Sequence, residues 1–480
     1  MPSVAGNTAP SVEPGALYRA VWRWHSYAGI VVAPFVIFLA IPGALDLWKP
    51  QYEAWRYRAL LTVAPATGMV SADAQFAAAT ATHPDATAIS FAPAFAADRT
   101  SETVLALPDG DVVSVFVNPH SGAVAGERRE SQRLMTTLHD LHGTLLSGTA
   151  GQLVVELVAS WALVLFLTGL YLWWPRPQFM VWGFLLPRLR AKGRTFWRDL
   201  HAVPAVWFSA ATLFMLSTGL LWTKAAGGWY RTLSAAIGQG TPRASNAAVH
   251  HSELVGWAPP LRAGLAEKID RLASAPADDP HAGHRRDALR QTAEQRPVSD
   301  AALPPSVSLD RVVAIAESRH VPHPYAITMP DGPTGVTGVL SDRNQPFNRT
   351  YLYLDRYSGK VLADVRYPAF GYLAKFFTWG IIMHEGQLFG LANQILGTLA
   401  ALGVLLLAAS GLAMWWQRRP AERFAAGSPR TPLPRPVFLG TLALAALLPL
   451  LAATLVLLLA FDFVLSRRLP WLKAATSAPS

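Results

Sequence analysis

Cysteine is absent from this chain of 480 residues. Its absence excludes disulfide bonds, iron–sulfur clusters held by thiolates and haem with a thiolate ligand. Charged residues are also scarce: Asp, Glu, Lys and Arg make up 15% of the chain, whereas soluble domains carry roughly 25%. Hydrophobic residues supply 51%. This composition indicates an integral membrane protein with sizeable aqueous parts.

Nucleotide-binding motifs are also missing. No G-x-G-x-x-G or P-loop pattern lies between an expected strand and an expected helix, which argues against a built-in nucleotide or flavin domain. The net charge of +10 does not indicate a nucleic-acid partner, because the arginines gather in two short loops, Arg176 to Arg198 and Arg418 to Arg435. Each loop follows an apolar segment, which is the positive-inside signature of cytoplasmic loops. We therefore expect the N-terminus inside and the aqueous parts and C-terminus outside.

Long apolar runs, by contrast, are present. The run Leu153 to Trp174 has about the ~20 residues needed to cross a bilayer, with Glu156 charged near its start. Similar runs predict further spans at Tyr27 to Trp48, at Val203 to Trp222, in a segment ending at Trp416, and at Val437 to Leu465. No cleavable signal peptide is evident in the first twenty residues, so we expect the first span to remain as an anchor.

The fold class predicted from these runs is a membrane α-helical protein with about five transmembrane helices, an internal duplication and two aqueous α+β modules. The expected order is a cytoplasmic tail (1–17), span 1 (18–48), module 1 (49–138), a histidine segment with span 2 (139–175), a basic loop (176–198), span 3 (199–224), module 2 (225–377) with a loop-rich insert (241–305), a second histidine segment with span 4 (378–417), a basic loop (418–436), span 5 (437–465) and a C-terminal tail (466–480).

The aqueous modules have strand and turn patterns. The piece TVLALPDGDVVSVFVNPHSGAVAGER predicts a β-hairpin or meander, with an Ala-rich helix from Ser71 to Thr82 beside it. In the second module SVSLDRVVAIAES predicts an amphipathic helix, and strands follow in YAITMPDGPTGVTGVLSD and RTYLYLDRYSGKVLADVRY. The piece LYLDRYSGKVLA repeats the pattern of VFVNPHSGAVAG, with Gly359 opposite Gly122, so the modules are duplicated too.

The duplication selects four of the thirteen histidines. An offset of 242 residues carries Gly169 onto Gly411 and His142 onto His384. An offset of 176 residues carries Gly43 onto Gly219 and His25 onto His201. Matched positions of this kind are what a duplicated cofactor site would leave.

Their spacing predicts two pairs at opposite membrane faces. His25 and Gly43 are eighteen residues apart, about 27 Å of helix against a hydrocarbon core of ~30 Å. His25 and His201 are then expected at the cytoplasmic edge, and His142 and His384 at or beyond the outer edge. Imidazole binds haem iron, so we predict two six-coordinate haem b groups. The expected aromatic walls are Trp22, Trp24, Trp197 and Trp207 for the inner pair, and Phe376, Phe377 and Trp379 for the outer pair.

Other interpretations stay open. His139 is one helical turn from His142 and is an alternative or additional outer ligand, ranked lower because its repeat equivalent is Ile381. Histidines at a membrane interface also often only bind headgroups or backbone. Zinc is a weaker rival because it would need Glu385 or Glu156 to complete its site. The remaining expectations are solvated side chains for His250, His251, His281 and His284, and structural roles for His320 and His323.

The chain resembles the PepSY-associated transmembrane helix proteins, some of which are labelled iron-regulated membrane proteins. The matching pieces are RWHSYAG, VNPHSGAVAG, LHDLHGTLL, TGLYLWWPR, RDLHAV, LYLDRYSGKVL, MHEGQLFG and SGLAMWWQRRP. The resemblance implies a bacterial inner-membrane protein with PepSY modules in the periplasm. In members that act as ferric-siderophore reductases, it also implies haem between the spans and an Fe(III) chelate as electron acceptor.

The function predicted from the histidines and the resemblance is that of a di-haem ferric-siderophore reductase, fed by a cytoplasmic or membrane donor such as a flavin or a quinol. Electron transfer of this kind needs no general acid or base, and we nominate no catalytic residue. A second hypothesis is a non-enzymatic regulator that binds a periplasmic peptidase or an envelope partner. A third, a metal or siderophore transporter, is disfavoured because ionisable residues such as Glu156 and Asp462 lie near span ends.

Overall fold

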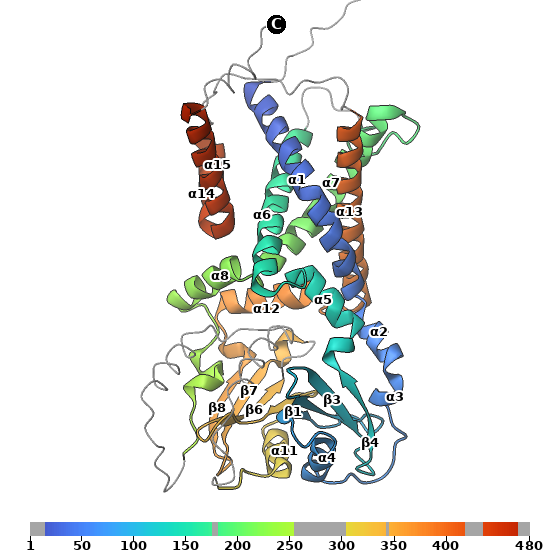
Figure 1. Ribbon diagram of the computed structural model, residues 1–480, viewed down its shortest axis with the longest axis vertical. Coiled ribbons are helices and arrows are strands. Elements are labelled where there is room, and N and C mark those ends of the chain that lie inside the picture. Colours follow the sequence, from blue (N-terminus) through green and yellow to red (C-terminus); the bar gives the residue numbers. More distant parts are fainter. Residues whose placement is uncertain (1–14, 175–180, 254–303, 342–344, 418–434, 469–480) are drawn as a thin grey trace, which may run out of the picture. The chain divides into compact units, whose positions relative to one another are not determined.

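The computed structural model describes residues 15–174, 181–253, 304–341, 345–417 and 435–468 (Figure 1). The chain divides into two compact units. One, here called the helix unit, comprises Met1–Ile41, Leu153–Leu220 and Leu399–Ser480. The other, here called the sheet unit, comprises Pro42–Gln152 and Leu221–Thr398.

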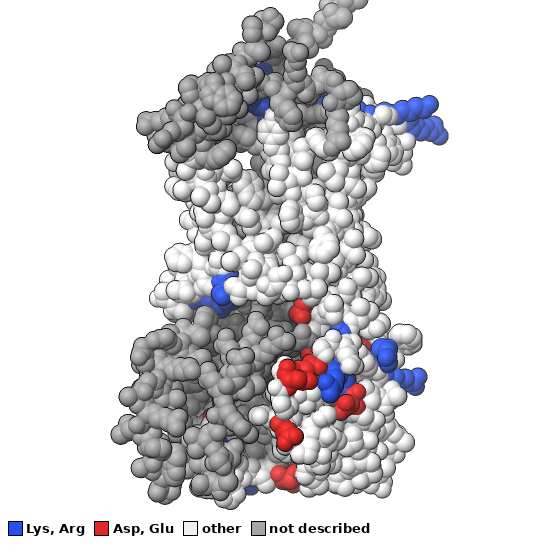
Figure 2. Space-filling view, viewed as in Figure 1, with Lys and Arg blue, Asp and Glu red and all other residues white. Residues whose placement is uncertain are grey.

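Four long apolar helices account for the expected spans 1 to 4. They are α1 (Ala16–Asp46), α6 (Gly148–Trp173), α7 (Gly193–Leu220) and α13 (Leu391–Trp416). In the described part of the chain, these four are long and apolar enough to cross a membrane. On the face drawn in Figure 2, the middle of these helices has no Lys, Arg, Asp or Glu at its surface. Uncharged side chains around helices of this length identify a membrane protein.

The expected fifth span differs from the structure. Two consecutive helices, α14 (Arg435–Leu447) and α15 (Pro449–Arg468), replace the single helix predicted from Val437 to Leu465. Their apolar parts, Val437–Leu447 and Pro449–Ala460, are each shorter than the ~20 residues of a span. Pro449 explains the break, because proline has no N–H to donate and its ring clashes with the carbonyl four residues earlier.

The strands form one antiparallel sheet in the order β4-β3-β2-β1-β5-β6-β7-β8. Each module supplies four neighbouring strands, and the halves join where Phe91 of β1 pairs with Ile327 of β5. The two modules predicted from the sequence are therefore halves of a single sheet. The strands are β1 (Thr87–Ala92), β2 (Ser101–Ala106), β3 (Val112–Val117), β4 (Val124–Arg129), β5 (Ala326–Thr328), β6 (Val336–Ser341), β7 (Thr350–Asp355) and β8 (Val361–Arg366).

Two helices cover one face of this sheet and form its core. They are α4 (Ala72–Thr80) and α11 (Leu309–Ser318), the helices predicted from the Ala-rich and amphipathic segments. Phe91, Ile327 and Leu352 are fully buried under them. The opposite face receives α12 (Tyr372–His384), whose Ala374 packs with Tyr351 and Val365.

The remaining elements of the sheet unit are short. The helices are α2 (Lys49–Arg56), α3 (Arg58–Leu61), α5 (Leu134–Thr144) and α8 (Ala225–Ala236). Single 3₁₀ turns are η1 (Glu130–Gln132), η2 (Arg243–Ser245), η3 (Ala247–Val249), η5 (Pro346–Asn348) and η6 (Tyr367–Ala369).

The helices α4 and α11 cap each other's N-termini. Asp73 accepts hydrogen bonds from the backbone N–H groups of Leu309 (2.9 Å) and Asp310 (3.2 Å). In return, Asp310 accepts one from the N–H of Ala72 at 2.7 Å. Each carboxylate thus satisfies N–H groups that have no partner within the neighbouring helix and opposes its positive end. This exchange ties the two duplicated modules together across the sheet.

Removing one of these caps should weaken the sheet unit. For Asp73→Ala we expect the free energy of unfolding to fall by about 1 kcal/mol, as for other lost N-caps. Burial alone would raise the pKa of Asp310, but hydrogen bonds from Ala72 and Asp73 lower this pKa below its ordinary value. The stability from this cap is therefore present above the ordinary Asp pKa and is lost as the pH falls through the lowered pKa. Denaturant melts at pH 7 and pH 3 measure both effects. Asp85→Ala, an exposed carboxylate, is the control, and an equal loss in it would contradict the capping role.

Candidate functional site: two histidine pairs

The inner pair lies within the helix unit. His25 of α1 and His201 of α7 have ring centroids 6.3 Å apart, with the ring planes at 83°. The 176-residue repeat therefore brings its two matched histidines into contact. These are side chains from different halves of the chain that meet on neighbouring helices.

Each inner ring is held through its Nδ1 atom by the next helix of its own repeat. His25 Nδ1 is 2.9 Å from Thr168 Oγ1 on α6, and the Thr168 hydroxyl donates its own proton to the carbonyl of Val164. With the hydroxyl proton on this carbonyl, Nδ1 is the donor to Thr168. His201 Nδ1 is 2.9 Å from the carbonyl of Leu407 on α13, which can only accept. In a neutral imidazole a protonated Nδ1 leaves the lone pair on Nε2, the arrangement found in metal-bound histidines.

The second repeat reproduces these contacts. The offset of 242 that relates the spans also carries Thr168 onto Ser410, and Ser410 Oγ is 3.2 Å from His201 Nδ1. The structure thus identifies Thr168 and Ser410 as supporting residues that the sequence analysis missed. Their signal was available in the sequence, because they occupy equivalent positions one residue before the aligned Gly169 and Gly411.

Glycines make room for three of the four rings. A Cβ atom at Gly169 would lie 3.3 Å from His25 Cε1, and one at Gly411 would lie 3.4 Å from His201 Cε1. At Gly43 the fit is tighter: a Cβ would lie 2.7 Å from both Cε1 and Nδ1 of His142. In the sequence these glycines served only to align the repeat. The structure shows that a side chain at any of these positions would crowd a histidine ring.

The outer pair lies within the sheet unit. His142 near the end of α5 and His384 at the end of α12 have ring centroids 6.4 Å apart, with the planes at 44°. Both predicted pairs therefore form, and each is drawn from both repeats.

The spacing of both pairs would allow the two imidazoles to hold one iron ion between them. A first-row metal binds an imidazole nitrogen at about 2.0–2.1 Å. A five-membered ring with bonds of about 1.33 Å has its centre about 1.1 Å from each atom. Two rings on opposite sides of one ion therefore have centroids about 6.2–6.4 Å apart. Edge-on contacts between rings cover about 4.5–7 Å, so the spacing gains its weight from the anchored Nδ1 atoms of the inner pair and from its occurrence twice.

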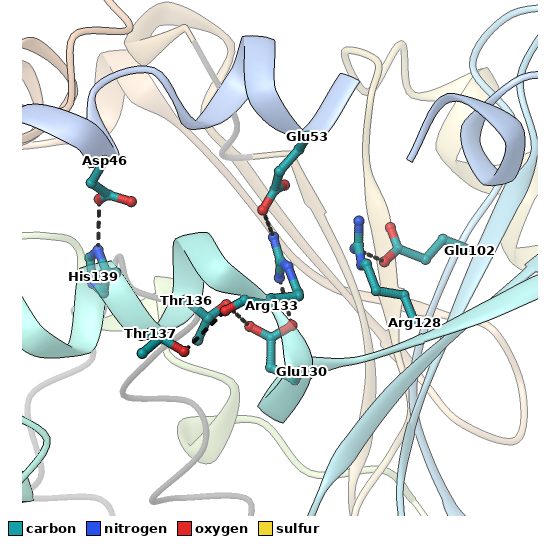
Figure 3. A network of polar contacts seen from close by, with 9 residues as sticks. All are labelled: Asp46, Glu53, Glu102, Arg128, Glu130, Arg133, Thr136, Thr137 and His139. Carbon is teal, nitrogen blue, oxygen red and sulfur yellow. Dashed lines mark hydrogen bonds and ion pairs between the residues drawn. The ribbon is translucent and has the colours of Figure 1, made fainter. Parts of the chain in front are cut away.

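His139, the alternative outer ligand, has a different partner. Its Nδ1 atom is 3.1 Å from Asp46 Oδ2 at the end of α1 (Figure 3). Burial lowers the pKa of His139, but the hydrogen bond and charge of Asp46 outweigh it and raise the pKa above its usual value. The ring that lies opposite His384 is that of His142, whereas His139 is paired with Asp46.

A second ion pair holds the helix that carries these histidines. Arg133 precedes α5 and binds both Glu53 of α2 and Glu130, while Thr136 donates to Glu130 at 2.6 Å (Figure 3). The Arg133 side chain is only 12% exposed. Together with the contact between Asp46 and His139, it fixes α5 to the corner between α1 and α2 at two points.

Glu385 adds an acidic group next to His384. Burial raises the pKa of Glu385 to about 7, although His139 and Lys49 oppose the shift. Within the described ranges, no group of three or more His, Asp or Glu side chains is placed to hold a metal ion, and Glu385 and Glu156 stay the residues that a zinc site would need.

Other predicted site features have different surroundings. Trp24, Trp207 and Phe376 are largely exposed, and the buried Phe377 stacks on Tyr230. His250 was expected to be solvated, but it contacts the carbonyl of Ala244 and packs on Tyr353. His323 pairs with Glu317, as expected for a structural histidine. His281 and His284 lie outside the described residues.

Breaking the clamp at Arg133 should loosen α5. Arg133→Gln leaves Glu53 and Glu130 without their buried cation, and we expect the free energy of unfolding to fall by about 3 kcal/mol. Arg129→Gln, which removes an exposed contact with Asp109, is the matched control and should cost less than about 1 kcal/mol. Hydrogen exchange of the α5 amides measures both. Equal exchange in the two variants would contradict the clamp.

Comparison with known proteins agrees with this architecture. No curated protein matches the chain. The family model of the PepSY-associated TM region matches residues 22–418, which include all four repeat-matched histidines and the long helices from α1 to α13. The family expected from the motifs is confirmed: the chain belongs to the PepSY-associated TM region family of membrane proteins.

Proposed function

We propose that the chain is a transmembrane oxidoreductase of the bacterial inner membrane that passes electrons through two haem b groups to a periplasmic Fe(III)-siderophore or similar ferric chelate. The observation that carries the proposal is the pair of imidazole contacts at 6.3 and 6.4 Å, each joining histidines at matched positions of the two repeats. Haem b, when bound, would supply a one-electron Fe(III)/Fe(II) couple.

The residues of the chain have distinct parts in this proposal. His25 and His201 would hold the inner group, and His142 and His384 the outer one. Thr168 and the carbonyl of Leu407 keep the Nδ1 protons in place, so that each inner Nε2 atom presents its lone pair. This anchoring orients the rings before any ligand binds and reduces the entropy that binding costs.

The helix α1 takes part in both sites. It carries His25 of the inner pair and, eighteen residues later, Gly43, which makes room for His142. Eighteen residues of helix rise about 27 Å, close to the ~30 Å of the hydrocarbon core. Two carriers at these levels would divide the crossing into shorter steps.

Transfer to the chelate requires no proton transfer by the protein. One electron leaves the outer site and reduces one Fe(III) ion, and a cytoplasmic or membrane donor of the flavin or quinol class restores the inner site. Reduction favours release, because Fe(II) binds hard oxygen ligands less tightly than Fe(III) does. We therefore nominate no general acid or base.

Visible spectra of the purified protein test the ligand assignment. We expect a Soret band with dithionite-sharpened α and β bands, and two haem b groups per chain by pyridine haemochrome. His25→Ala and His384→Ala should each remove about half of the haem, because each variant breaks one pair and spares the other. His139→Ala is the matched control and should keep both groups. A colourless, folded wild-type protein would contradict the proposal and favour the PepSY-type regulator of a peptidase or envelope partner.

Electron delivery is tested with protein in sealed proteoliposomes. Dithionite-reduced protein should be reoxidised by a ferric chelate added on the side of the sheet unit, with one Fe(II) formed per electron. His384→Ala should slow this reoxidation at least tenfold, because the outer carrier is lost. The corresponding Ga(III) chelate, which accepts no electron, is the control. Equal reoxidation by wild type and variant would mean that the outer pair does not serve the chelate.

A further inference from the structure

The sheet unit has an apolar surface of its own, formed by two helices. On α8 and its C-cap the exposed residues include Trp229 (47% exposed), Leu233 (41%) and the cap residue Ile237 (56%), which follow one another at intervals of four. On α12 they are Tyr372 (81%) and Phe376 (58%), with the same spacing. Residues four apart share one side of a helix. We call these five residues the platform.

The two helices are locked together behind this surface. The rings of Tyr230 and Phe377 stack with centroids 5.6 Å apart, and the Tyr230 hydroxyl donates to the carbonyl of Leu373 at 3.0 Å. Gln239, just beyond α8, accepts from the N–H of Tyr372 through its side chain and from Ala374 through its carbonyl. The helices α8 and α12 therefore form one rigid pair (Figure 1).

A close backbone approach adds to this lock. A Cβ atom at Gly371 would lie 2.3 Å from the carbonyl carbon of Gln239, so only glycine fits there. The platform is thus apolar on a fixed backbone, and its side chains cannot be buried by closing α8 onto α12, since that interface is already filled.

Charge distinguishes the platform from α11, the amphipathic helix of the same unit. Along all of α8 and α12 the sequence has two charged residues, Arg231 and Lys375. The outward side of α11, on the opposite face of the sheet, carries Arg311 and Glu317. A helix exposed to water has a polar outer side, as α11 does, whereas an apolar outer side indicates a second apolar contact.

We propose that the platform is a membrane-surface anchor that embeds Trp229, Leu233, Ile237, Tyr372 and Phe376 in the interface between lipid and water. Connectivity favours lipid as the occupant. Four residues separate the apolar span α7 from α8, and six separate α12 from the apolar span α13. At ~3.5 Å per residue, neither helix can lie far from the end of a membrane span.

The side-chain types support the same occupant. Trp and Tyr are enriched where acyl chains meet headgroups, and Lys extends its ammonium group from that depth towards water. Lys375 lies 5.6 and 5.7 Å from the rings of Tyr367 and Tyr372 and donates to the carbonyl of Pro368. Because α12 ends at His384, such an anchor would also hold this histidine at a set depth.

The absence of cysteine from the chain makes the test direct. Single-cysteine variants Leu233→Cys and Phe376→Cys carry a nitroxide label in full-length protein in nanodiscs. Collision with oxygen, which concentrates in lipid, is compared with collision with a water-soluble nickel chelate. Leu402→Cys on α13, 51% exposed, is the lipid control, and Ala314→Cys on α11 is the water control. Circular dichroism and gel filtration verify that each variant folds.

Both platform labels should have a ratio of oxygen to nickel collision rates several-fold above that of the label at Ala314. This ratio should be closer to that of the label at Leu402 than to that of the label at Ala314. A ratio equal to the water control would overturn the proposal. Shielding from both reagents would overturn it as well, because it would show that a protein partner or a second copy covers the platform. The readout does not involve haem, so a failure here and a failure of the proposed electron transfer are distinguishable.

Discussion

The architecture depends on how a histidine ring is held inside an apolar helix bundle. A buried Nδ1–H group needs an acceptor, and lipid offers none, so the acceptor must come from a neighbouring helix. In the first repeat Thr168 on α6 serves His25 on α1, and in the second the carbonyl of Leu407 on α13 serves His201 on α7. Each repeat is thereby a helix pair joined at the Nδ1 atom of its histidine, and the two pairs meet at the histidine rings.

The two halves of the sheet unit are also joined by polar contacts, but these are backbone hydrogen bonds between strands instead of side-chain contacts. Neither four-stranded half closes on itself: β1 and β5 would both be open edges, and their pairing removes both. The exchange of Asp73 and Asp310 between α4 and α11 acts in the same way at the helix ends. Duplication thus gives two halves that satisfy each other, and this is why the outer histidines, one from each half, belong to one rigid unit.

The two halves are not equal everywhere. The repeat offsets carry His139 onto Ile381 and Asp46 onto Trp222, so an ion pair in the first half corresponds to two apolar residues in the second. Both members change together, as expected, because removing one partner of a buried pair leaves an uncompensated charge. The surroundings of His142 and His384 therefore differ in charge. A group bound between the two rings would experience an asymmetric electrostatic field.

The sequence alone determined the four long apolar helices, the strands of each module apart from β1, and the four matched histidines. These features depend on apolar length, alternation and repeat spacing, which are local or additive along the chain. The sequence did not determine β1, whose TAISFA segment lacks a clear alternation, whereas Pro449 predicted a bend in the last apolar run, where the structure has two helices. The fusion of the two modules, the contact between His139 and Asp46 and the clamp at Arg133 were decided by tertiary structure. These contacts join residues distant in sequence, and only the packed backbone sets which charged groups come close enough to pair and which glycines must stay small beside a ring.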